Sequence, residues 1–199
     1  MDEWLNIVIR QLILYSLPVL ISLTVVVLCE SRQTGIAIPH PFFAILWRGT
    51  WLPLLASIAF HRGVIVALPN SLMSGIKPAA VRFIAHSLLC LLGFVLFSWS
   101  LAHQLSTGLP PLHHWWAKVL MFFNLCMACL HLLPLPGLLV GECLIHSTAG
   151  KSIRPYIHNN SGWLGITVLA ASPLLDMVLG TVVVFPVYEF LSGQAVHIF

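Results

Sequence analysis

The sequence predicts an all-α protein, a polytopic bundle of transmembrane helices with about five spans and one short half-helix. Composition is the first observation behind this prediction: of 199 residues, 59% are hydrophobic and only 8% are charged, far from the usual composition of soluble domains. The second is that apolar runs long enough to cross the hydrocarbon core recur between short polar segments. Because no polar block is long enough to fold separately, we expect residues 1–199 to form a single integral membrane domain.

Each expected span is an apolar run of roughly 20 residues, the length that crosses about 30 Å of hydrocarbon. Pro18 is an expected kink in the first run, and Pro53 interrupts the second, which either spans or dips into the membrane and returns. The last run is long enough to be tilted or kinked at Pro173 and Pro186. In chain order, the five runs cover residues 12–29, 51–68, 79–103, 117–133 and 163–191.

Charged residues in the short loops predict an orientation. The formal net charge is +3 and is spread over loops without the basic stripe that nucleic-acid binding needs, so we expect no nucleic-acid partner. An N-terminus in the cytoplasm, with a half-helix that does not cross, places more of the Lys and Arg residues of the short loops inside. Those expected inside are Arg10, Lys77, Arg82, Lys151 and Arg154, and those expected outside are Arg32, Arg48 and Lys118.

A Pro-x-Pro-Gly break interrupts the chain after the fourth run, where Pro134, Pro136 and Gly137 follow one another closely. Proline lacks a backbone donor and blocks the carbonyl one turn back, so the break leaves polar backbone that lipid cannot satisfy. That backbone must face protein or a water-filled cavity. Residues 138–146 are too few to cross a membrane alone, and we expect them to form a half-helix packed against protein.

Four ionisable side chains in apolar stretches form a candidate intramembrane polar site: His86, His131, Glu142 and Asp176. Such groups are costly inside a membrane and are functional candidates by default. His131 precedes Pro134 by three residues, so its ring can reach backbone freed by the break. A structural hydrogen-bonding role and a role in a ligand or proton site both remain open for it. Glu142 or Asp176 can pair with either histidine.

Motifs for catalysis or metal binding are missing from the sequence. Neither H-E-x-x-H nor G-x-S-x-G occurs. The adjacent His113 and His114 point about 100° apart on a helix, which makes a poor ligand pair, and we expect them to be solvated at the membrane interface beside Trp115 and Trp116. We therefore expect no catalytic residues, no metal and no cofactor.

Two further patterns keep alternatives open. Cys126 and Cys129 have the spacing of a redox motif, but they lie within an apolar helix that does not favour thiolates. Histidine is a common axial ligand of haem, so a haem held between His86 and His131 remains an alternative to the expectation of no cofactor.

The stretch around the break resembles the site-2 protease family of intramembrane zinc metallopeptidases, in particular its compact bacterial branch. A late helix of that branch reads approximately N-L-x-x-x-x-F-N-L-L-P-x-P-P-L-D-G, and residues 124–125 and 130–138 follow this pattern closely. Weaker similarity extends over residues 41–55 and 66–89, and the resemblance covers about residues 12–190. The positions that match or replace the family motif are Asn124, His131, Pro134, Pro136 and Gly137.

The departures from the family fall on its chemistry. The family binds zinc through two histidines of H-E-x-x-H and the aspartate of L-D-G, and its glutamate is the general base for a zinc-bound water. Here the early helix has one carboxylate, Glu30, and no histidine, and Leu138, Leu139 and Val140 fill the L-D-G position. His131 stands where the family has asparagine. The resemblance therefore implies a catalytically silent relative that keeps the helical frame.

Together these observations predict a non-enzymatic integral membrane protein of the bacterial inner (cytoplasmic) membrane. Its expected partners are the lipid bilayer and other integral membrane proteins, for which it would be a subunit, an assembly factor or a regulator. Two alternatives stay open. One is an active zinc peptidase with unusual ligands such as His86, His131 and Asp176, and the other is a haem-binding or proton-conducting subunit.

Overall fold

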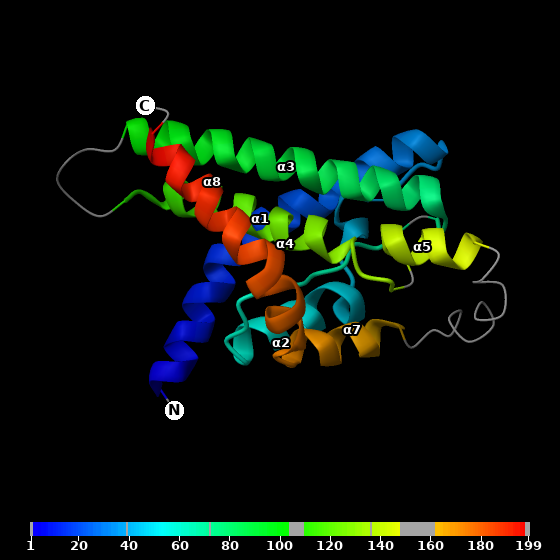
Figure 1. The fold of residues 1–199 in the computed structure, drawn as a ribbon, viewed down its shortest axis with the longest axis horizontal. Helices are drawn as coiled ribbons and strands as arrows, with labels where there is room; N and C mark the ends of the chain where they lie inside the picture. The colour runs from blue at the N-terminus through cyan, green and yellow to red at the C-terminus, as the bar shows by residue number, and fades with distance from the viewer. Residues whose placement is uncertain are drawn as a thin grey trace.

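The computed structural model describes residues 2–38, 40–71, 73–103, 110–135, 137–147 and 162–197. These residues form helices and irregular segments without a strand, which confirms the all-α prediction for this part of the chain (Figure 1). The α-helices are α1 (Asp2–Thr34), α2 (Leu52–Ala59), α3 (Ile76–Ala102), α4 (Leu112–Leu130), α5 (Leu139–His146), α7 (Gly162–Ala171) and α8 (Phe185–His197). A short 3-10 helix, η1 (Pro41–Ala44), and two π-helices, η2 (Trp47–Trp51) and η4 (Asp176–Val184), complete the described elements.

Three described helices are long and apolar enough to cross a membrane, and they indicate a membrane protein. They are Glu3–Thr34 in α1, Ile76–Ala102 in α3 and the continuous stretch Asp176–Ala195 of η4 and α8. The expected count of about five spans is not confirmed. The predicted half-helix is present as α5, which begins one residue later than expected.

Residues 51–68 do not cross as a helix. The α-helix within this run, α2, is eight residues long and rises only about 12 Å, and it ends at Ala59. The chain then returns, because the N–H of Leu68 donates to the carbonyl of Gly49 at 2.9 Å and the N–H of Asn70 donates to the carbonyl of Ala44 at 3.0 Å. The end of the stretch is therefore hydrogen-bonded to the residues just before its start. Of the two alternatives left by the sequence, this is the one in which the run dips in and returns.

This re-entrant path overturns the predicted separation of the charges. Arg82, near the start of α3, lies 3.0 Å from Glu30, near the end of α1, so these two helix ends lie together. Arg32 and Lys77 consequently share one end of the helix pair instead of lying on opposite sides of the membrane. The prediction was wrong because it counted a crossing that the chain does not make.

The other end of the helix pair carries different charges. Arg10 of α1 lines a groove together with Trp115 of α4, so the start of α1 lies beside the start of α4. Lys118, on the next turn of α4, belongs to this same end. Arg10 and Lys118 were expected on opposite sides, and the structure places them together. Lys151 and Arg154, which also entered the predicted orientation, lie outside the described residues.

The core lies where α3 and α4 pack against each other, with α1 on one side of them. Figure 1 shows α4 beneath α3, and α2 and α7 together on the side away from α3. Gly93 permits the close approach of the two central helices, because a Cβ there would lie 2.5 Å from the backbone nitrogen of Met121. Small residues at helix contacts serve the same purpose in many membrane proteins.

The last predicted run, 163–191, is divided into two helical parts. α7 ends at Ala171, shortly before Pro173, and packs against α2. The chain then continues through η4 and α8, which carry it past α3 without a break at Pro186. The break at Pro173 follows from the missing backbone donor of proline, as the sequence predicts.

Candidate functional site

The chain turns sharply between α4 and α5, at the predicted break. Helix α4 ends at Leu130, and Gly137 has a φ of 79°, a left-handed conformation that glycine adopts without steric cost. Gly141 in α5 packs so closely on the Leu135 carbonyl that a Cβ would clash with it. Pro136 lies outside the described residues, so nothing tests its predicted role. The turn brings the start of α5 back onto the end of α4.

His131 holds this turn by hydrogen bonds to the backbone. Its Nδ1 accepts a hydrogen bond from the N–H of Leu139 at 3.2 Å, and its carbonyl accepts one from the N–H of Val140 at 3.1 Å. The first N–H groups of a helix have no partner within the helix, and His131 supplies two acceptors for α5. Of the two roles left open by the sequence, the structural one is therefore present.

Glu142 binds the other side of the turn. Its Oε1 accepts a hydrogen bond from the N–H of Gly137 at 2.9 Å, and its Oε2 lies 3.8 Å from Nδ1 of His146. The carboxylate is buried, and its side-chain partners among the described residues are Gly137 and His146. Glu142 therefore belongs to the break. Among the described residues it makes no hydrogen bond or ion pair with His86 or His131.

Arg82 connects the break to the end of α1, and it was not among the candidate site residues predicted from the sequence. One guanidinium nitrogen, Nη2, donates to the carbonyl of Gly137 at 2.9 Å, and the other, Nη1, donates to Oε1 of Glu30 at 3.0 Å. Ser71 and Met73 also bind this pair, because Nη1 donates to the Ser71 hydroxyl at 2.6 Å and the N–H of Met73 donates to Glu30 at 2.9 Å. Both charges are buried.

The signal for this pair was present in the sequence as opposite charges at the ends of two apolar runs. It was missed because Arg32, two residues after Glu30, and Arg82 were assigned to opposite sides of the membrane. Buried ion pairs are tolerated when additional hydrogen bonds support both groups, and here further hydrogen bonds reach Oε1 of Glu30 and the guanidinium of Arg82.

A second buried network surrounds Asn124. Its Nδ2 donates to the hydroxyl of Ser22 and to the carbonyl of Leu120, each at 2.8 Å, so its Oδ1 faces Nδ1 of His86 at 2.8 Å. Because an amide oxygen only accepts, Nδ1 of His86 carries the hydrogen of this bond, and in the neutral ring Nε2 is then the acceptor. That Nε2 is buried and has no hydrogen-bond partner among the residues that the structure describes.

The structure brings together two of the four predicted polar residues. The ring centroids of His86 and His131 lie 6.1 Å apart. Asp176 instead begins η4, where its Oδ1 accepts a hydrogen bond from the N–H of Val64 at 2.7 Å. In the described ranges, no three His, Cys, Asp or Glu residues are grouped so as to hold a metal ion. His86, His131 and Asp176, the ligands considered for an unusual zinc site, are therefore not grouped together in the described residues.

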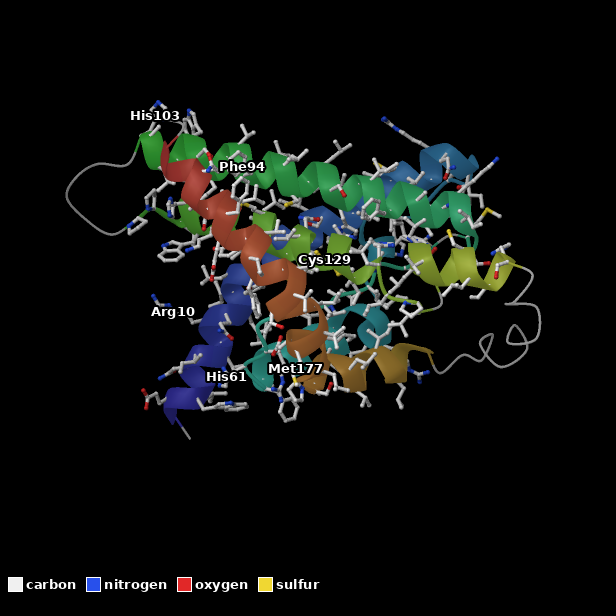
Figure 2. All side chains as sticks on the ribbon, in the orientation of Figure 1. Arg10, His61, Phe94, His103, Cys129 and Met177 are labelled. Atoms are coloured by element: carbon white, nitrogen blue, oxygen red, sulfur yellow. The ribbon has the colours of Figure 1, made fainter. Side chains whose placement is uncertain are left out.

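The remaining sequence candidates are packed into the bundle or lie at its edge. His114 is buried, with Nδ1 3.2 Å from the Ser100 hydroxyl and its ring 5.0 Å from that of Phe97. The expectation that His114 is solvated was wrong, because its side chain lies against Ser100 and Phe97 of α3. Its neighbour His113 is exposed, as expected. Cys126 and Cys129 are buried thiols, and Figure 2 shows Cys129 inside the bundle.

Comparisons with family models, with curated proteins and with solved structures found no significant match to this chain.

Proposed function

We propose that this chain is a non-catalytic membrane protein with a site-2 protease-like helical frame, which acts as a subunit, an assembly factor or a regulator of a larger complex in a bacterial inner membrane. The observation that carries the proposal is the use of polar side chains at the break. Arg82, His131 and Glu142 bind the backbone that the break exposes, so these groups serve its architecture. These three side chains at the break are therefore engaged by backbone, which argues against a catalytic role for them.

The position of Glu30 supports the absence of catalysis. This residue is the one carboxylate within residues 24–32 of the early helix, where the resembled family has its metal-binding and catalytic residues. Here a buried guanidinium lies 3.0 Å from it and would repel a divalent cation. Leu138, at the position where the family has its aspartate motif, is a buried apolar residue.

A face of α3 supports the proposal of a membrane partner. Ile84, Leu88, Leu91 and Val95 are all exposed, and their spacing of four, three and four residues places them along one side of the helix. This is the spacing with which a helix packs along another helix. Partners reached through such a row would themselves be integral membrane proteins.

Cross-linking in the native membrane tests the proposal. A photo-reactive residue at Leu88 is expected to capture a membrane protein in stoichiometric yield, whereas the same residue at Val182, which is 68% exposed on η4, captures lipid. Gentle detergent extraction and identification of the co-purifying protein give the same answer independently. Stoichiometric zinc together with cleavage of a transmembrane substrate would contradict the proposal.

One observation favours a second candidate, a haem-binding or proton-conducting subunit. Nε2 of His86 is buried without a partner among the described residues, and the ring of His131 is close to it. A haem would give the purified protein a Soret band that His86→Ala removes, and proton conduction would give a flux that the same variant abolishes. An unaltered spectrum and flux in His86→Ala and His131→Ala would eliminate this candidate.

A further inference from the structure

We propose that a groove between the start of α1 and the start of α4 binds one anionic phospholipid, with its headgroup at Arg10 and Lys118 and an acyl chain along α1. The groove has a volume of about 580 Å³. Its lining is mostly apolar, and Arg10 and Gln11 are the polar members. The residues that line it are Ile7, Arg10, Gln11, Ile13, Leu14, Leu112 and Trp115.

The cations at this groove lack protein anions. Arg10 is exposed, and Figure 2 shows its side chain projecting from α1 on the side away from α2. The ammonium of Lys118 lies 5.7 Å from the ring of Trp115, which lines the same groove. No carboxylate in the described part of the chain forms an ion pair with either cation. An anion from outside the protein would therefore complement both charges.

The position of these cations matches that of a lipid phosphate. Arg10 precedes the long apolar part of α1, and tryptophans such as Trp115 and Trp116 concentrate at the headgroup level of a bilayer. Basic pockets between transmembrane helices recognise anionic lipid headgroups by this combination of charge and apolar wall. A soluble anion would use the cations but not the apolar wall.

A second groove lies further along α1, where its lining begins three residues after Leu14. It has a volume of about 450 Å³ and is lined by Leu17, Pro18, Ile21, Leu96, Trp99, His113, Trp116, Ala117 and Leu120. From Arg10, at the proposed headgroup, to Ile21 the helix rises by about 16 Å, at 1.5 Å per residue. One leaflet contributes roughly half of a hydrocarbon core about 30 Å thick, so the two grooves are long enough for one acyl chain.

Trp116 provides an independent observation at the second groove. Its side chain lines the groove, and its indole N–H is buried without an acceptor among the described residues. Buried indole N–H groups usually have a hydrogen-bond partner. A lipid ester carbonyl is an acceptor that could reach this N–H after a small rotation of the side chain.

Native mass spectrometry of the purified full-length protein tests the proposal. Samples are equilibrated with equimolar phosphatidylglycerol and phosphatidylcholine that carry identical acyl chains. We expect the protein to retain one phosphatidylglycerol in at least fivefold preference. Arg10→Gln and Lys118→Gln should each reduce its retention by about fivefold, the value of one lost charge near a membrane surface. Equal retention of the two lipids by the unchanged protein would overturn the proposal.

The matched control is Lys77→Gln, which removes an exposed cation at the opposite end of α3 and should leave lipid retention unchanged. An equal loss in this control would show that only net charge matters and would overturn the site. A photo-reactive residue at Leu14 in the native membrane distinguishes the occupants. Phospholipid as the main cross-linked product is expected, and a protein as the main product would overturn the proposal.

Discussion

The two ends of α1 use charge in different ways. Near its C-terminal end, Glu30 and Arg82 are buried, paired and hydrogen-bonded to backbone of two other segments. Near its N-terminal end, Arg10 is exposed at an apolar groove and has no acidic partner within the described structure. The first arrangement joins parts of the chain to one another, whereas the second leaves charge available to a molecule outside it. Burial and partners, more than residue type, separate an architectural charge from a binding charge.

The strongest test of this comparison is removal of the buried cation. Arg82→Met would leave Glu30 without its ionic partner and the Gly137 carbonyl without its donor, and we expect a loss of about 3–5 kcal/mol in the free energy of unfolding. Denaturant unfolding in detergent measures it. The double variant Glu30→Gln with Arg82→Met should recover part of the loss. A stability equal to that of the unchanged protein would mean that the pair does not hold the fold.

A smaller effect is expected at the buried amide. Asn124→Leu removes the acceptor of the His86 N–H and the donor to the Ser22 hydroxyl, both in the interior. Unsatisfied buried groups cost about 1–3 kcal/mol each, so the unfolding transition should move to lower denaturant concentration. Asn124→Gln is the matched control, because it keeps a carboxamide and should lose less stability than Asn124→Leu. Equal stability of Asn124→Leu and the unchanged protein would show that water satisfies these groups.

His131 should make a smaller contribution still, because it supports one helix end. His131→Phe keeps an aromatic ring but removes the acceptor for the Leu139 N–H, and loss of such a cap costs about 1 kcal/mol. We expect faster amide hydrogen exchange in α5 while α3 exchanges as before. His131→Asn restores a side-chain acceptor and should recover the protection. Unchanged exchange in His131→Phe would assign the capping to the backbone alone.

The smallest effect on stability belongs to the exposed end of α1. Arg10→Gln in lipid-free detergent should leave the unfolding midpoint unchanged, since no interaction within the described chain is lost. Addition of phosphatidylglycerol should then raise the midpoint of the unchanged protein more than that of the variant, because a ligand stabilises the state that binds it. An equal rise in both proteins would remove the distinction between the two ends.

Local sequence features predicted the helical elements well. The apolar run at α3, the break after α4 and the short α5 were placed within a few residues, because apolar length and proline act on the chain where they occur. Helix α1 contains the predicted run 12–29 but begins ten residues before it. The run at residues 51–68 was ambiguous for the same reason: its length permits a span, and its outcome depends on contacts with distant backbone. The structural role of His131 was anticipated as one of two possibilities by its spacing from Pro134.

Candidate residues were harder to predict when their partners lay far along the chain. His86 and Asp176 were both identified as polar residues in apolar stretches, but the structure gives them separate partners. Asp176 binds the backbone of Val64, 112 positions away, and His86 binds Asn124, 38 positions away. Spacing within one helix does not contain this information.

The sequence by itself determined that the chain is helical and apolar, that it is broken after α4 and that its early helix lacks the histidines of the resembled zinc family. These are properties of residue type and local spacing. Only the tertiary structure decided that residues 51–68 return, that Glu30 meets Arg82 across 52 positions and that the polar groups at the break bind backbone. Burial favours polar groups that have a hydrogen-bond partner, but which partner a group has depends on the segments that the fold brings together.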